Sequence, residues 1–278
     1  GEKVHFTKLI YALGSECFIP PIEGSSLPEV VAIRRLSDVE KVEKLMETSS
    51  NAVVIGGGVL GLEAAWELKK AGLTVQVLEV ARVLMGRQLD AGSAEILKQT
   101  ANKSGVAIDT GVSVAAIEGV EHVTGVRLAD GTVIPAELVI VSAGVRANTA
   151  LAQEIGLDIG RAVKVSPKME TSVPGIYACG DCAEYDGANY AIWPEAVEQG
   201  RIAGANAAGE ELEYEPVAAA LTFHGMNTAL FAAGDNGKNP DLLYKTVEYR
   251  DMGKGRYRKY YFLNNRLSGV ILMGDLSE

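Results

Sequence analysis

Three glycines, Gly56, Gly58 and Gly61, separate an apolar segment from a helical one, and their spacing fits Gly-x-Gly-x-x-Gly. In a strand-turn-helix unit the first glycine permits the tight turn, and the second lets a pyrophosphate approach the backbone. The third lets helix and strand pack closely. The helix start, at Val59 and Leu60, offers free N–H groups and partial positive charge to phosphates. This spacing predicts a dinucleotide-binding site.

A carboxylate downstream of these glycines indicates which dinucleotide is preferred. Glu79 ends a second apolar segment, Thr74 to Leu78, and follows Gly61 by about 20 residues, as the ribose-binding acid of such sites does. Its oxygens can accept hydrogen bonds from both ribose hydroxyls, and its charge would repel a 2′-phosphate. Ala65, in contrast, is a small residue often seen with NADPH. The sequence therefore favours NADH without excluding NADPH.

The segments that must position these residues alternate between strand and helix, which predicts an α/β fold with a Rossmann-like sheet. The expected strands and helices lie at 35–47, 52–55, 61–72, 74–78, 91–103, 106–108 and 137–142. Between Val112 and Val133 the pattern changes to short alternating strands, with a tight turn at Asp130-Gly131. Antiparallel hairpins are expected there.

The composition is that of a globular protein with about two domains. The chain has 278 residues, 47% of them hydrophobic, and a formal net charge of -10. This charge argues against nucleic acid and anionic membrane as general partners. No apolar run has the length of a membrane span, and the N-terminal GEKVHFTKLI lacks a signal-peptide pattern. Three cysteines make no disulfide scaffold, so a cytoplasmic location is expected.

Motifs outside the glycine-rich turn match one family. An opening strand leads into Ala12-Leu13-Gly14, where Leu13 replaces a usual threonine, and then into the connector IPPIEG at 19–24. Residues 171–184, TSVPGIYACGDCAE, match Thr-x-x-Pro-x-Ile-Tyr-Ala-x-Gly-Asp. Residues 143–148, AGVRAN, approximate Gly-x-Arg-Pro-Asn with alanine in place of proline. The sequence thus resembles the two-dinucleotide flavoproteins of the pyridine-nucleotide-disulfide oxidoreductase type, nearest the rubredoxin-reductase and nitrite-reductase branch.

The resemblance implies FAD and NAD as cofactors and gives roles to individual residues. Gly14, Gly180 and Asp181 would contact the flavin, with Asp181 accepting a hydrogen bond from a ribityl hydroxyl. The backbone N–H of Trp193, at a helix amino end, would face the flavin pyrimidine. For the side chain of Trp193, a purely structural role as an aromatic residue of the core is given equal weight. Gly144 would lie in the loop that passes near the nicotinamide of NAD.

Glu63, two positions after Gly61, matches a glutamate that helps to position the nicotinamide carboxamide in related enzymes. An ordinary acid on the helix surface is the alternative.

The resemblance also divides the chain into four parts. They are a remnant of a FAD-binding domain at 1–28, an NAD(H)-binding domain with an inserted antiparallel meander at 29–147, a return segment of the FAD-binding domain at 148–214, and a small α+β interface domain at 215–278. The family's first Gly-x-Gly-x-x-Gly, which grips the ADP half of FAD, does not occur in the chain. We therefore expect a fragment that is shortened at both ends, which could bind NADH while holding no flavin.

Two other clusters suggest alternative chemistry. Cys179 and Cys182 form a Cys-x-x-Cys pair, which would suit a thioredoxin-reductase-like relay from flavin to disulfide. This pair surrounds the Gly-Asp that is expected to hold the ribityl chain, so the relay is disfavoured. The three histidines are scattered and have no ligand spacing with cysteines or carboxylates, so no metal site is expected.

The basic run RDMGKGRYRK, Arg250 to Lys259, is interpreted first as a solvated strand face. A sharper hypothesis is a docking patch for a small acidic electron carrier, because complementary charge speeds encounter. The patch would consist of Lys254, Arg256, Arg258 and Lys259.

Together these features predict an oxidoreductase that passes hydride from NADH to FAD and electrons on to an external acceptor, such as rubredoxin or a related carrier. A non-catalytic NADH-binding module and a flavin-free dehydrogenase are the alternatives, and a homodimer is left open.

Overall fold

The computed structural model describes residues 3–217, 220–251 and 256–276, which divide into two compact units. The smaller unit combines the chain up to Phe18 with Gly144–Val217. The larger unit combines Ile19–Ala143 with the C-terminal segment from residue 220. Each unit is therefore built from two stretches of chain that are far apart in the sequence.

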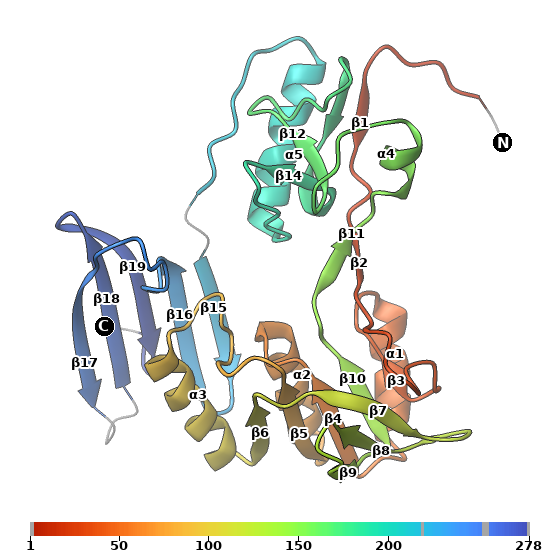
Figure 1. Ribbon diagram of the computed structural model, residues 1–278, viewed down its shortest axis with the longest axis vertical. Helices are drawn as coiled ribbons and strands as arrows, with labels where there is room; N and C mark the ends of the chain where they lie inside the picture. The colour runs from red at the N-terminus through yellow and green to blue at the C-terminus, as the bar shows by residue number, and fades with distance from the viewer. Residues whose placement is uncertain (1–2, 218–219, 252–255, 277–278) are drawn as a thin grey trace. The chain divides into compact units, whose positions relative to one another are not determined.

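A five-stranded parallel sheet forms the centre of the larger unit, in the order β3-β10-β4-β5-β6 (Figure 1). Its strands are β3 (Val30–Val31), β10 (Leu138–Val141), β4 (Asn51–Ile55), β5 (Thr74–Glu79) and β6 (Val106–Thr110). Successive side chains point to opposite faces, so Val54 belongs to one apolar core and Val53 to another. The predicted α/β sheet is confirmed.

Three helices accompany this sheet: α1 (Leu36–Met46), α2 (Val59–Lys70) and α3 (Ala91–Lys103). Helix α2 starts immediately after Gly58, its N-cap residue, and follows β4 directly. Helix α3 starts after Asp90, whose Oδ1 accepts a hydrogen bond from the Ser93 N–H at 2.8 Å. The amino end of α2 therefore lies at the carboxyl end of β4, where open α/β sheets bind their ligands.

A three-stranded antiparallel meander covers the second apolar core. It consists of β7 (Val114–Gly119), β8 (Val123–Leu128) and β9 (Val133–Pro135). Ile117 and Val126 are buried in the same core as Val53 and Val139 of the parallel sheet. The predicted hairpins are thus confirmed.

The described C-terminal residues form a five-stranded antiparallel sheet in the order β15-β16-β19-β18-β17 (Figure 1). Its strands are β15 (Ala220–Gly225), β16 (Thr228–Gly234), β17 (Lys245–Asp251), β18 (Arg256–Leu263) and β19 (Arg266–Met273). Phe223, Leu230 and Ile271 share the first core with Leu62 of α2 and Leu97 of α3. In the described ranges 220–251 and 256–276 this segment contains strands and their connections but no helix. The helical part of the expected α+β arrangement therefore does not occur in these ranges.

The smaller unit joins the start of the chain to its central part. Strand β1 (Leu9–Tyr11) pairs in parallel with β13 (Ile176–Ala178), and β2 (Ser15–Cys17) pairs antiparallel with β11 (Val145–Ala147). Its remaining elements are β12 (Val163–Val165), β14 (Ala183–Tyr185), α4 (Ala150–Glu154), a 3-10 turn (Gly180–Cys182) and α5 (Trp193–Ala207). In the described part of the chain, none of the helices is both long enough and apolar enough to span a membrane.

Candidate functional site

The glycine-rich turn between β4 and α2 can be built only with glycine at two positions. Gly56 has φ +119°, and a Cβ added to it would lie 2.2 Å from the carbonyl oxygen of Ser142. A Cβ at Gly61 would lie 2.1 Å from the carbonyl oxygen of Gly56. A side chain at Gly56 would displace the backbone that follows β10, and one at Gly61 would push α2 away from the turn. The two glycines therefore set the close approach of helix to strand that the sequence predicted.

Gly58 differs from its neighbours because its missing side chain faces open space. A Cβ there would meet nothing within 4 Å, and φ is -78°, an ordinary value for any residue. As the N-cap of α2, Gly58 precedes N–H groups that have no acceptor inside the helix. Together with the helix dipole, this open cradle fits an approaching pyrophosphate.

The Glu79 carboxylate lies at the glycine-rich turn. Its Oε2 accepts a hydrogen bond from the Gly57 N–H at 2.6 Å, and its Oε1 accepts one from the Ala81 N–H at 2.7 Å. The end of β5 thus brings an acid beside the start of α2, as the spacing predicted. These residues fit the adenosine ribose and pyrophosphate of a dinucleotide such as NAD(H).

The loop that follows Glu79 was not singled out from the sequence, yet it completes this site. The Met85 N–H donates to the Gly57 carbonyl at 3.0 Å. Leu84 packs so closely that a Cβ on Gly57 would lie 2.5 Å from its Cδ2. The sequence contained one sign of this close packing. Gly57 is a glycine at a position where the Gly-x-Gly-x-x-Gly pattern allows any residue.

The smaller unit gathers the residues that the sequence assigned to a flavin. Ser15 Oγ donates to Asp181 Oδ2 at 2.7 Å, across a sequence separation of 166 residues. Gly14 and Gly180 both have positive φ, at 66° and 76°. The Gly180 N–H donates to Oε1 of Gln199, a buried residue of α5, at 2.9 Å. The two separate motifs therefore form one cluster, in which the sequence missed Ser15 and Gln199.

Trp193 is the first residue of α5, and its side chain is 82% exposed. The interpretation of this side chain as a core aromatic is therefore wrong. The helix is instead anchored through Glu195, which is 5% exposed and accepts a hydrogen bond from the Tyr214 hydroxyl. The Trp193 N–H lies in the first turn of α5, where helix N–H groups are available to an acceptor outside the helix.

Comparison with known proteins agrees with this arrangement. The family model described as pyridine nucleotide-disulphide oxidoreductase matches residues 1–200, and the rubredoxin NAD+ reductase C-terminal domain matches residues 220–278. The chain belongs to the pyridine nucleotide-disulphide oxidoreductase family. This family comprises FAD- and NAD-dependent flavoproteins.

Relatives of this chain extend well beyond the matched region. Nitrite reductase [NAD(P)H] of Bacillus subtilis (strain 168) is 35% identical over 274 residues, which are 98% of this chain and 34% of that protein. NADH-rubredoxin oxidoreductase of Clostridium acetobutylicum is 27% identical over 278 residues, 100% of this chain and 68% of that protein. The NAD-dependent persulfide reductase structure from A. fulgidus has TM-score 0.91 and 28% identity, with 99% of this chain and 55% of that one covered. The chain thus spans about a third of the first of these relatives and about half of the last.

Two further residues of the predicted set lie in different compact units of the chain. Gly144, with φ +91°, starts the second stretch of the smaller unit, and its carbonyl accepts a hydrogen bond from the Phe18 N–H at 2.9 Å. Glu63 is half-buried on α2 in the larger unit. Burial, and then the charge of Glu67, raise the pKa of Glu63, while His224 on β15 opposes that rise. A carboxyl held partly out of water in this way differs from the ordinary surface acid of the alternative interpretation.

The Cys-x-x-Cys pair of the chain is unsuited to disulfide exchange. Cys179 packs with Tyr177 and Ile202, whereas Cys182 packs with Ala152 and Val163 in a separate core. Both thiols are buried and free, and the Cys182 thiol donates to the Cys179 carbonyl oxygen at 3.2 Å. Burial raises the pKa of Cys179 to about 11 and also raises that of Cys182. Because the thiolate is the attacking species, the relay alternative is disfavoured.

We expect a thiol reagent at pH 7 to modify neither Cys179 nor Cys182 in the folded protein. Burial blocks access, and the raised pKa values keep both groups protonated. In a colorimetric titration, no more than one thiol, that of Cys17, should react before denaturant is added, and all three cysteines should react afterwards. Adding NADH should leave the native count unchanged. Two additional fast-reacting thiols after reduction would restore the relay alternative.

The basic run does not form the free patch of the sharper hypothesis. Arg258 is 8% exposed and donates to the carbonyl oxygen of Met273 at 2.8 Å and to that of Asp275. Lys259 forms an ion pair with Asp90. Arg258 and Lys259 therefore stabilise contacts within the larger unit. The hypothesis that they belong to a docking patch for an acidic carrier is wrong. Lys254, the remaining lysine of that hypothesis, lies outside the described residues.

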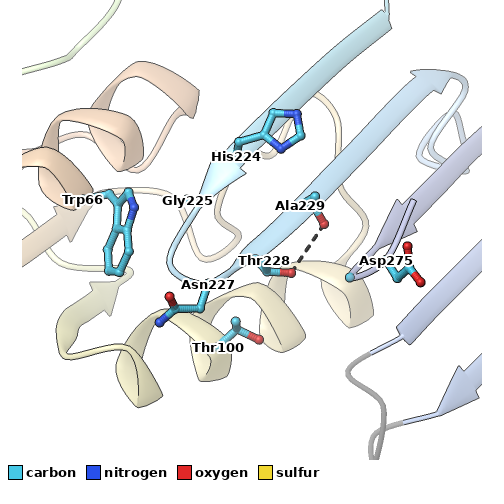
Figure 2. A pocket seen from close by; sticks show the side chains of 9 residues that line it. Trp66, Thr100, His224, Gly225, Asn227, Thr228, Ala229 and Asp275 are labelled. Carbon is cyan, nitrogen blue, oxygen red and sulfur yellow. Dashed lines mark hydrogen bonds between the residues drawn. The ribbon is translucent and has the colours of Figure 1, made fainter. Parts of the chain in front are cut away.

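A pocket of about 670 Å³ opens between α2, α3 and the β15–β16 turn (Figure 2). Figure 2 shows Trp66 and His224 on one side of it and Thr100 of α3 below. Its lining residues are Trp66, Thr100, His224, Gly225, Asn227, Thr228, Ala229, Gly274 and Asp275. This set shares no member with the predicted site residues. In the described part of the chain, no group of three or more His, Cys, Asp or Glu side chains could hold a metal ion.

Proposed function

We propose that this chain is the NADH-binding and flavin-contacting part of an oxidoreductase that passes hydride from NADH to FAD and electrons on to rubredoxin or a related carrier. One observation carries the proposal: two separate groups of residues, the glycine-rich turn with Glu79 and the Ser15–Asp181 cluster, each have a geometry that fits part of a nucleotide cofactor. A binding module that uses NADH alone would need only the first.

Each group of residues has a separate task in this proposal. FAD, when bound, supplies the electron chemistry by accepting hydride from NADH. Gly56 and Gly61 shape the turn, and the first N–H groups of α2 bind the pyrophosphate. Glu79 accepts hydrogen bonds from the adenosine ribose and disfavours a 2′-phosphate. Glu63 positions the nicotinamide.

On the flavin side, Ser15 orients the Asp181 carboxylate, which accepts a hydrogen bond from a ribityl hydroxyl in this proposal. The positive φ of Gly14 and of Gly180 lets the backbone turn away and leaves room for the flavin. The amino end of α5, at Trp193, stabilises negative charge on the reduced ring. Gln199 fixes α5 to the Gly180 turn.

The carrier is proposed from the relatives. The C-terminal segment matches the rubredoxin NAD+ reductase C-terminal domain, and one relative is named NADH-rubredoxin oxidoreductase. Other relatives are named nitrite reductase and NADH oxidase. The relatives therefore agree on a reaction with NADH or NADPH, and the rubredoxin-like acceptor is proposed in addition. A cytoplasmic location and a homodimer belong to the same proposal, as does the division into domains at 1–28, 29–147, 148–214 and 215–278.

The central test is reduction of the flavin by NADH. We expect the full-length protein, after incubation with FAD, to lose its flavin absorbance under anaerobic conditions when NADH is added, and to do so more slowly with NADPH. Glu79→Gln should weaken NADH binding about tenfold and narrow the difference from NADPH, because one ribose acceptor and one repelling charge are lost. The Glu121→Gln variant, which changes an exposed acid near the meander, should behave as wild type. A protein that binds NADH but never acquires flavin would favour the non-catalytic module.

A further inference from the structure

The loop of residues 80–90, which we call the adenosine loop, contacts the glycine-rich turn through buried side chains. Leu84, Met85 and Leu89 are each no more than 3% exposed and lie in the first apolar core. The Met85 N–H donates to the carbonyl oxygen of Gly57, the same residue whose N–H donates to Glu79. The position of this loop therefore determines the shape of the ribose end of the site.

Hydrogen bonds within the adenosine loop shape only part of its backbone. The N–H groups of Gln88 and Leu89 donate to the Met85 carbonyl at 2.8 and 3.0 Å. Met85 itself has φ +46°, in the left-handed region that is unfavourable for a long side chain. Such a conformation persists only where surrounding contacts impose it, so contacts from outside the loop also determine its position.

The C-terminal sheet supplies these contacts. After β16, the Asn236 Nδ2 group donates to the Arg87 carbonyl at 3.1 Å, and the Lys238 ammonium donates to the Gly86 carbonyl. At the end of the loop, Asp90 accepts a hydrogen bond from the Tyr261 hydroxyl at 2.7 Å. Gly86, Arg87 and Asp90 of the loop are thus all held by residues of the C-terminal sheet and its connections.

The segment that carries Asn236 and Lys238 is itself fixed to the sheet. The Asp235 N–H donates to the Ser268 carbonyl at 2.9 Å. Gly237 lies against the Tyr261 ring, where an added Cβ would be 2.5 Å from Cε1. The donors to Gly86 and Arg87 therefore move together with the tyrosine that binds Asp90.

We propose that Asn236 and Lys238 are positioning residues for NADH, which act by holding the adenosine loop against the glycine-rich turn. The inference rests on the proposed NADH site and adds to it that the C-terminal sheet sets the affinity for the adenosine half of the cofactor. Neither residue contacts the cofactor in this account. Their effect passes through Gly86, Arg87 and Met85 to Gly57.

The test compares single variants by NADH and ADP-ribose binding. Lys238→Met keeps the length of the side chain and removes its charge, and Asn236→Ala removes the amide donor. Each should raise the dissociation constants for NADH and for ADP-ribose by about 3- to 10-fold, and by the same factor, because the shared adenosine half is affected. Lys238→Arg, which keeps a cationic donor, should restore most of the affinity. Lys245→Met, which removes another lysine of this sheet that bonds Asn265, is the matched control.

Hydrogen exchange gives a readout that general destabilisation would not reproduce. In Lys238→Met, amides of residues 80–90 should exchange faster, while those of the meander, 114–128, should be unchanged. Wild-type affinity and exchange in both single variants, with NADH binding still weakened by Glu79→Gln, would overturn the inference and leave the proposed function standing. Exchange that rises equally in loop and meander would also overturn it. An unmodified protein that binds neither NADH nor ADP-ribose would overturn both proposals.

Discussion

Gly58→Val should abolish NADH binding and leave the protein folded. The valine side chain would enter open space at the N-cap of α2, where a Cβ meets nothing within 4 Å, and the backbone there is compatible with any residue. That space is where a pyrophosphate must approach the backbone. We expect the dissociation constant for NADH, measured by fluorescence titration, to rise at least about 100-fold. The free energy of unfolding should change by about 1 kcal/mol or less.

Gly61→Ala, three positions away, should instead lower the stability of the fold. Its Cβ would lie 2.1 Å from the Gly56 carbonyl oxygen, a backbone atom that cannot rotate aside. This variant should lose about 3 kcal/mol of stability in denaturant unfolding. If Gly58→Val bound NADH as wild type does, the amino end of α2 would not be the pyrophosphate site.

Asp90→Ala should lower the free energy of unfolding by about 3 kcal/mol. The carboxylate caps α3 through the Ser93 N–H and also pairs with Lys259, whose side chain is only 17% exposed. Removing it leaves the partly buried ammonium group with only the Glu248 carboxylate, at 3.5 Å, and removes a helix cap. Equilibrium unfolding in urea measures the difference.

Asp38→Ala is the matched control for this change. Asp38 lies at the N3 position of α1, on the surface, and accepts hydrogen bonds from the backbone N–H groups of Arg34 and Arg35. Its removal should cost only the cap, about 1 kcal/mol. Equal losses in the two variants would show that the contact of Asp90 with Lys259 contributes nothing.

The effect of Asp90 should also depend on pH. Hydrogen bonds from Lys259 and Ser93 outweigh burial and lower the pKa of Asp90 below its usual value. The unfolded chain therefore binds a proton at a higher pH than the folded chain does, and stability rises with pH in that window. The contribution is fully present above about pH 4, the ordinary pKa of an aspartate, and is lost as the pH falls from there through the lower folded pKa. The stability gap between wild type and Asp90→Ala should narrow below about pH 4.

The glycine-rich turn and Glu79 could be predicted from sequence because their geometry is local. Tight turns, helix starts and the strand that follows are fixed by residues close together in the chain, and the structure places Glu79 on the Gly57 N–H. The pairing of Ser15 with Asp181 was only partly accessible. The motifs on both sides were visible, but their contact depends on a strand pairing between β1 and β13.

The C-terminal segment shows where sequence reasoning fails. A row of basic residues has the same pattern whether it faces solvent or an acid from elsewhere in the fold, and the partner of Lys259 is Asp90, 169 residues away. The exposure of Trp193 could not be predicted either. Large aromatic side chains are mostly buried, and no residue near Trp193 in the sequence indicates that this one is exposed. Long-range packing decided both cases.

The division of each unit into two separated stretches has a consequence for the order of folding. The β2–β11 ladder can close only when Phe18 and Gly144 are brought together, and the whole of residues 19–143 lies between them. Random closure of so long a loop is entropically slow, whereas a sheet already formed from residues 19–143 would hold its two ends in place. During synthesis the parallel sheet would therefore assemble first and act as a template, and the segment from Gly144 would then pair with β2, which is made before residues 19–143.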